Sequence, residues 1–204
     1  MKWNKDNKRN SSEELNYTED IKLFLSYLRD LLLWVVGTLL VFTFLFRMVI
    51  VSGSSMEKTL VDGDCLLLLG NVFYTSPEKG DIVVISKHSY DDGKSIIKRI
   101  IATEGQVVDI DFDSGIVYVD GKALDEPYTN TPTNLDEGVL FPLTVDEGCV
   151  FVLGDNRNVS KDSRSAEIGL IDCREIVGKV ICLLFPGNSK GNVIRDFNRI
   201  GAVS

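Results

Sequence analysis

The longest run of apolar residues covers positions 31–46 and contains no charged side chain. As a helix this run would be about 24 Å long, and continuing through Arg47 to Val51 would extend it to about 31 Å. That length is enough to cross the hydrocarbon core of a bilayer, and Arg47 near one end could reach the headgroups. The pattern therefore predicts a transmembrane anchor over residues 31–51.

The residues before this run are mostly polar. Residues 1–20 contain few apolar side chains, which predicts a mobile tail, and residues 21–30 have the pattern of a helical lead-in. Lys and Arg residues in the tail favour an N-terminus on the cytoplasmic side. We therefore expect a cytoplasmic tail and lead-in helix over residues 1–30, with the rest of the chain beyond the anchor lying outside the cell membrane.

Two other interpretations of the apolar run remain open. A buried core helix is disfavoured by the length of the run. A cleaved signal peptide is the second, because Val51-Ser52-Gly53 resembles a small-residue cleavage site. The long leader of mixed charge and the length of the run favour a permanent anchor instead.

Beyond residue 51 the apolar positions follow the short periods of β-strands. In residues 107–112 three apolar side chains alternate with two aspartates, and residues 116–119 form a second short apolar segment. Asp92-Gly93 and Asp120-Gly121 are typical of hairpin turns. This pattern predicts a mainly β domain over residues 52–204.

Further short apolar runs, flanked by Gly or Asp, are expected to be strands buried on both faces. They are CLLLLG, DIVVIS, CVFVLGD and GKVICLLF. Residues 125–148 are rich in loop residues and contain three prolines. We therefore expect a loop-rich insert or flap near residues 107–148.

The charge of the chain limits its partners. The 204 residues carry a formal net charge of -8, and the acidic residues predominate beyond the anchor. An acidic domain repels phosphate backbones, so we expect no nucleic-acid partner.

Metal binding is also not expected. With one histidine and four cysteines, none of them at C-x-x-C spacing, the chain offers a poor zinc site. The cysteines are expected to be core residues, with a disulfide as the alternative. Residues 109–115 mimic the start of a calcium loop, but Ser114 occupies the position where Gly is required.

Candidate chemistry begins with a group of serines directly after the anchor, in VSGSSMEKTL. A serine hydroxyl needs a base to become a nucleophile. His88 is a candidate base but lies in a polar stretch typical of an exposed loop. Lys98 lies among isoleucines, and on a strand it would share a face with Ile96 and Ile100. Burial there would lower its pKa, as a lysine base requires.

A third stretch, FVLGDNRNVSKDSR, covers residues 151–164 and concentrates Asp, Asn, Arg and Ser after a strand-like run. It is either a solvated polar loop or a carboxylate–guanidinium network that fixes a loop beside a site.

Together these stretches resemble the type I signal peptidases, membrane-bound serine proteases that remove secretory signal peptides. The resemblance extends from the anchor to about Phe185. The matching segments, in chain order, are Ser55-Met56 to Thr59-Leu60, Gly80 to Val84, Lys98-Arg99, and Gly154 to Arg164. The middle region VYVDGKALDEPY is also similar.

The resemblance implies a signal-peptidase-type β-sheet catalytic domain, related to the repressor-type self-cleaving proteases, behind one transmembrane helix. It implies that Ser55 is the nucleophile, that neutral Lys98 is the general base, and that no cofactor or metal is used. Ser160 would orient the lysine, and the backbone N–H of Ser55 would form part of the oxyanion hole. The residues expected to support the site are Ser160, Asp155, Asp162, Arg164, Met56 and Gly53.

Three positions depart from the usual pattern of that family. Lys58 replaces a proline, and Gly53 occupies a position where some members have a hydroxyl donor to the oxyanion hole. The usual Gly-x-Pro-Gly-Asp after the base is replaced by ATEGQ, which keeps Gly105.

The expected substrates are secretory pre-proteins, cleaved after small residues at A-x-A sites. The lipid bilayer is an expected partner because it would hold both anchor and substrate. Two other functions remain open: a self-cleaving regulator with the same dyad, and a membrane-anchored binding domain whose motifs are vestigial.

Overall fold

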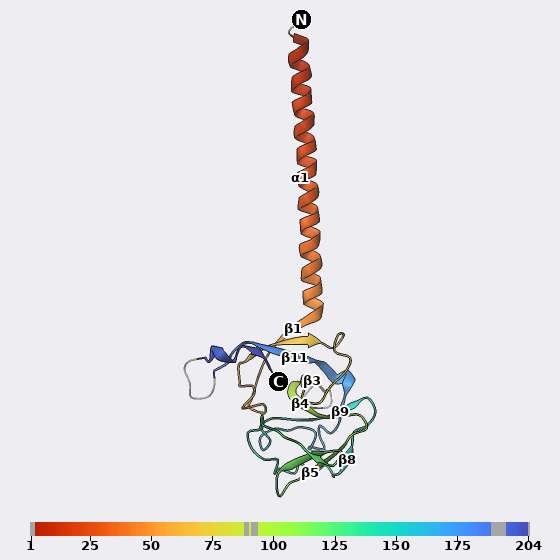
Figure 1. Cartoon of the computed structure of the whole chain (residues 1–204), viewed down its shortest axis with the longest axis vertical. Coiled ribbons are helices and arrows are strands. Elements are labelled where there is room, and N and C mark those ends of the chain that lie inside the picture. The colour runs from red at the N-terminus through yellow and green to blue at the C-terminus, as the bar shows by residue number, and fades with distance from the viewer. Residues whose placement is uncertain (1–2, 88–89, 91–93, 189–194, 204) are drawn as a thin grey trace. The chain divides into compact units, whose positions relative to one another are not determined.

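The computed structural model describes residues 3–87, 90, 94–188 and 195–203. The chain divides into two compact units, Met1–Phe44 and Leu45–Ser204. The first unit is helical and the second is built from β-strands and loops (Figure 1). The hairpin predicted at Asp92-Gly93 and the candidate base His88 lie outside the described residues.

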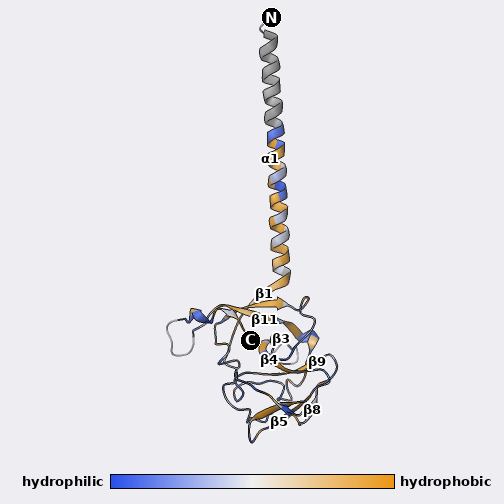
Figure 2. Ribbon diagram, viewed as in Figure 1, coloured by the Kyte–Doolittle hydropathy of each residue, from blue (hydrophilic) through white to orange (hydrophobic). Residues whose placement is uncertain are grey.

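Helix α1 runs without interruption from Trp3 to Leu45. Within it, Glu19–Thr43 is long and apolar enough to cross a membrane, with a mean hydropathy of 1.7 and no buried residues in its apolar part. The apolar positions of this part of the helix are visible in Figure 2. A helix that could cross a membrane is therefore present where the anchor was expected, and residues 3–20, expected to be a tail, continue the same helix.

The predicted end of the anchor at Val51 is corrected by the structure. The helix ends at Leu45, and Phe46–Ile50 form strand β1. Strand β1 pairs antiparallel with β2, for example Arg47 opposite Leu68. Apolar, β-branched residues suit either a membrane helix or a strand, and pairing with a distant segment decides between them.

The larger of two sheets contains eight strands. Its order is β1-β2-β11-β3-β4-β9-β10, with β12 added beside β11. The remaining bounds are β2 Cys65–Gly70, β3 Ile82–Ser86, β4 Ser95–Thr103, β9 Cys149–Leu153, β10 Ile171–Asp172, β11 Ile176–Phe185 and β12 Gly201–Ala202. All the pairs are antiparallel. Among the described residues, the 3-10 helices η2 (Cys173–Glu175) and η3 (Phe197–Arg199) lie in its connections.

A smaller sheet has the order β7-β6-β5-β8. Its strands are β5 Val107–Asp111, β6 Ile116–Val119, β7 Lys122–Ala123 and β8 Leu143–Thr144. The predicted alternation in β5 is confirmed, because Val108 and Ile110 are buried while the aspartates are exposed. The predicted turn at Asp120-Gly121 is also confirmed, since both residues have positive φ and connect β6 to β7.

Two of the four strands expected to be buried on both faces behave as predicted. In β3 and β9, four of five residues are buried. In β2 buried and partly buried positions alternate instead. Strand β11 alternates in the same way over residues 176–181 and ends in two exposed residues, so one face of these strands is less well covered. The segment 125–148 is loop-rich as predicted, with β8 as its one strand in the described residues.

Candidate active site

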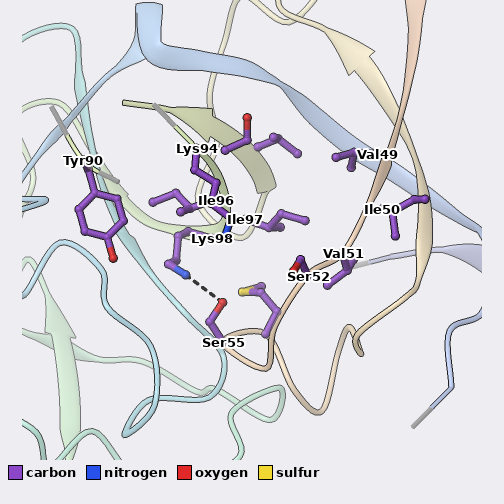
Figure 3. A pocket seen from close by; sticks show the side chains of 13 residues that line it. Val49, Ile50, Val51, Ser52, Ser55, Tyr90, Lys94, Ile96, Ile97 and Lys98 are labelled. Atoms are coloured by element: carbon purple, nitrogen blue, oxygen red, sulfur yellow. Dashed lines mark hydrogen bonds between the residues drawn. The ribbon is translucent and has the colours of Figure 1, made fainter. Parts of the chain in front are cut away.

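Lys98 and Ser55 lie in direct contact. Lys98 lies in β4 opposite Val83 of β3, and only 3% of it is exposed. Its Nζ donates a hydrogen bond of 2.9 Å to Ser55 Oγ, drawn as the dashed line in Figure 3. The proximity expected from the sequence is confirmed, although 43 residues separate the two along the chain.

Burial is the main influence on the Lys98 amine. Removal from water lowers its pKa from 10.5 to about 8, opposed by the negative charges of Asp162 and Asp155. Ile96 and Ile100 on its flanks belong to one apolar cluster, as the strand pattern predicted. Among the described residues no carboxylate forms an ion pair with Lys98. Such an amine can accept a proton from the hydroxyl that it contacts.

Ser55 lies in a loop whose two ends are bonded together. The N–H of Val51 donates to the carbonyl of Asp64 at 2.8 Å, and the N–H of Gly63 donates to the carbonyl of Val51 at 2.9 Å. We call residues 51–64 the nucleophile loop. Met56 and Leu60 are fully buried in the core beneath it, which fixes its inner side.

Asn156 holds the nucleophile loop from the opposite side. Its N–H donates to the carbonyl of Ser55 at 3.0 Å, and its side-chain amide donates to the carbonyl of Ser54 at 3.0 Å. A side chain on Gly154, two residues before Asn156, would collide with Ser160 and with the Ser55 carbonyl. Only glycine therefore lets these segments approach so closely.

The predicted carboxylate–guanidinium network is present and buried. Asp155 accepts two bonds from Arg99, at 2.9 and 2.8 Å, and a third from the Thr59 hydroxyl at 2.5 Å. Asp162 is paired with Arg164 at 2.8 Å, and both side chains are fully buried. The network thus joins β4, beside Lys98, to the nucleophile loop through Thr59.

Segment 126–130 crosses the outside of this network. Glu126 pairs with Arg157, and the ring of Tyr128 lies 4.0 Å from the guanidinium carbon of Arg99. Lys58 reaches the same segment, with its Nζ donating to the carbonyl of Pro127 at 2.7 Å. Its φ of 88° is outside the range that proline can adopt, so the loop here differs from one built around proline.

Ser160 forms no hydrogen bond to Lys98 in the described part of the chain, although the resemblance implied that it orients this lysine. Ser160 is buried, and its hydroxyl donates to the Lys161 carbonyl at 3.4 Å. Gly53, with a φ of 99°, donates its N–H to Asp62 at 2.8 Å, which leaves that N–H engaged.

A pocket of about 160 Å³ opens beside the Ser55–Lys98 contact. Its walls come from the end of β1 and the residues after it, and from the beginning of β4 (Figure 3). Val49, Val51, Ile96 and Ile97 provide apolar surface, and Tyr90 lies at one side.

The predicted set is therefore mostly gathered at one place, but three contacts were not anticipated. Thr59, Asn156 and Arg99 tie Ser55 and Lys98 to the network. All three lie within the motifs matched from the sequence, but their residue types alone did not indicate these contacts. Residues 109–115 form a strand and a turn in which Asp111 accepts bonds from Ser114. No group of possible metal ligands occurs among the residues described.

Comparison with known proteins gives consistent matches. The sequence model of the family described as "Signal peptidase, peptidase S26" matches residues 24–185. Signal peptidase I of Bacillus licheniformis is 35% identical over 187 residues, which cover 87% of this chain and 96% of that protein. Signal peptidase I T of Bacillus subtilis is 34% identical over 192 residues, covering 88% and 95%. A crystal structure of a signal peptidase I from Enterococcus faecalis is 29% identical and covers 52% of this chain and 97% of that one, with a TM-score of 0.41.

Proposed function

Because this chain belongs to the signal peptidase family, peptidase S26, we propose that Ser55 and Lys98 are the dyad with which it cleaves signal peptides. The protein is a serine endopeptidase, and its substrates are secreted pre-proteins that carry signal peptides. The observation that carries the assignment of the dyad is the 2.9 Å contact between a serine hydroxyl and a buried amine whose pKa is lowered to about 8.

In the first half of the reaction the Ser55 oxygen attacks the scissile carbonyl while neutral Lys98 takes the hydroxyl proton. The C–N bond breaks, and the lysine gives this proton to the departing amine, leaving an ester on Ser55. In the second half, Lys98 takes a proton from a water molecule that attacks the ester. The C–O bond breaks, the proton returns to Ser55, and the carboxylate product leaves.

Developing negative charge on the carbonyl oxygen requires hydrogen-bond donors. The N–H of Ser55 has no acceptor in the described part of the chain and is free for this role. Gly53 offers no side chain, and its N–H is bonded to Asp62. The hydroxyl of Ser52 lines the same pocket as Ser55, whereas Ser54 does not, so we assign the second donor to Ser52.

The substrate is expected to bind as an added strand. Strand β4 pairs with β9 only from Arg99 onward, so no strand among the described residues pairs with residues 95–98 on that side. In the described part of the chain, β1 pairs on one side only. The pocket lies between these two edges, so an extended peptide could bond to both. Its small apolar volume suits the small side chains of an A-x-A site.

Membrane attachment brings enzyme and substrate together. Glu19–Thr43 is the proposed anchor, with the N-terminus in the cytoplasm and the β domain outside. The apolar part of a signal peptide lies in the same bilayer, so both partners diffuse in two dimensions at high effective concentration. Asp155, Asp162, Arg164 and Met56 would hold the site in shape. Ser160 would support it through its close approach to Gly154.

The test uses the full-length protein in detergent with a labelled secretory precursor that has an A-x-A site. Wild type should release the mature protein, whereas Ser55→Ala and Lys98→Met should each lose at least about 10³-fold in rate. Lys122→Met, an exposed lysine in β7 of the other sheet, is the matched control and should retain full activity. Unchanged cleavage by Lys98→Met would reject the dyad. Absence of cleavage by wild type with any precursor would favour a binding domain instead.

A further inference from the structure

The chain continues beyond residue 185, where the family match ends, and returns to the nucleophile loop. We call the described residues 186–188 and 195–203 the C-terminal segment. Strand β12 in this segment pairs with β11, and Val203 packs against the apolar cluster beneath the loop. The segment is thus fixed to the same core that supports Met56.

The contact between segment and loop centres on Asp64, the last residue of the nucleophile loop. Asp64 is fully buried, so its carboxylate requires several donors. One comes from within the loop, the N–H of Val61 at 2.8 Å. The others come from the C-terminal segment: Gly187 N–H at 2.7 Å, and Arg199 Nη1 and Nη2 at 3.0 and 2.7 Å.

Arg199 also reaches further along the loop. Its Nη2 donates to the carbonyl of Thr59 at 3.2 Å, in addition to its bond with Asp64. The hydroxyl of Thr59 in turn donates to Asp155, which pairs with Arg99 next to Lys98. The Arg199 guanidinium therefore joins Asp64, at the end of the nucleophile loop, to Thr59, which connects this loop with the buried network.

The position of Arg199 is itself fixed locally. Asp196 caps η3, because its carboxylate accepts from the N–H of Asn198 at 3.0 Å. The side chain of Arg199 is only 26% exposed, and its two donor nitrogens match the two oxygens of Asp64. Such a two-pronged, half-buried arrangement fixes orientation as well as distance.

We propose that Arg199 is a positioning residue, through which the C-terminal segment holds the nucleophile loop in the geometry that places Ser55 against Lys98. It touches neither reacting atom and acts through Asp64 and Thr59. The expected effect of Arg199 on the rate of cleavage rests on the proposed function. Its expected effect on the order of the nucleophile loop does not depend on catalysis.

The test compares Arg199→Met and Arg199→Lys with Arg174→Met in the full-length protein. Arg174 forms a similar two-pronged pair with Asp172, but its side chain is 89% exposed and lies outside the nucleophile loop and its contacts. Kinetics are measured at a temperature where circular dichroism shows all variants folded, together with hydrogen exchange of the loop amides.

Arg199→Met should lower kcat by about 10-fold to 100-fold, because small displacements of a nucleophile are costly, while KM stays within about twofold. Arg199→Lys keeps the positive charge but loses the two-pronged hydrogen bonding of the guanidinium, and should recover part of kcat. Amides in residues 52–62 should exchange faster in Arg199→Met only. Arg174→Met should match wild type in both measurements.

Two results would overturn the inference: wild-type kcat in folded Arg199→Met, or the same loss in Arg174→Met. A wild-type protein that cleaves no precursor would instead reject the proposed function. In that case hydrogen exchange still decides the inference, since unchanged exchange in Arg199→Met would refute the support of the loop by Arg199.

Discussion

Lys98 and three arginines of the neighbouring network are all almost completely buried, yet their partners differ in kind. Each arginine forms an ion pair with a carboxylate: Arg99 with Asp155, Arg157 with Glu126, and Arg164 with Asp162. Lys98 contacts a neutral hydroxyl. Among the residues that the structure describes, this small region thus holds three buried guanidinium groups with counter-ions and one buried amine without a counter-ion.

This difference in partners distinguishes the arginines, whose charges stabilise the structure, from the lysine, whose amine is suited to proton transfer. A guanidinium remains charged at any relevant pH, so burial is tolerable only when a carboxylate is supplied. A lysine without a counter-ion can instead lose its proton, which is what a general base at neutral pH requires. The arrangement predicts opposite changes in the free energy of unfolding. Removing the carboxylate of a buried arginine should lower it, whereas removing the Lys98 amine should raise it.

The largest effect is expected from removing a counter-ion. Asp155→Asn should destabilise the domain by about 3–5 kcal/mol, because it leaves the charge of Arg99 buried without its partner. Denaturant unfolding of the variant measures this loss. A decrease of less than about 1 kcal/mol would mean that the pair is not an essential part of the network.

Removing the Lys98 amine, which has no carboxylate partner among the described residues, should change stability in the opposite direction. The pKa of Lys98 is about 8 in the folded protein, against 10.5 for an ordinary lysine, so between these values the unfolded chain binds more protons. The cost to folding is complete below pH 8 and disappears above pH 10.5. Lys98→Met should therefore be more stable than wild type at pH 7, by about 3 kcal/mol, while inactive.

The pH series supplies the control for that prediction. The stability advantage of Lys98→Met should shrink as pH rises from 8 to 10.5, because wild type loses its penalty over that window. Lys122→Met should show no such trend. If the stability advantage of Lys98→Met did not depend on pH, the gain would come from packing of the methionine rather than from removal of the amine.

A smaller change is expected in the pH dependence of cleavage by wild type. With Lys98 titrating near 8, kcat/KM should rise about tenfold per pH unit below 8 and level off above it. Initial rates on one precursor between pH 6 and 10 measure this profile. A flat profile across that range would contradict the assignment of Lys98 as the base.

Those features of the fold and the site that depend on the pattern of neighbouring residues are predictable from the sequence. The alternation in β5 and the isoleucines around Lys98 are properties of neighbouring residues. The end of the helix at Leu45 was not predictable in this way, because residues 46–50 suit a helix or a strand until they pair with β2. The 3-10 helix that places Arg199 is similar, since its contact with Asp64 joins positions 135 residues apart. Contacts of that kind depend on tertiary packing and leave no periodic pattern.

The smallest effect is expected at an ion pair on the surface. Asp172→Asn weakens the pair with Arg174, which lowers the pKa of Asp172 to about 2. That contribution is lost only as pH falls from 3.8 toward 2, and solvent screens it because the pair is exposed. Asparagine can also keep the cap on the first N–H of η2 that Asp172 provides. At pH 7 the melting temperature should therefore remain within about 1 °C of wild type, against the large loss in Asp155→Asn. Equal losses in the two variants would show that burial does not distinguish these pairs, and would remove the basis for contrasting Lys98 with its arginine neighbours.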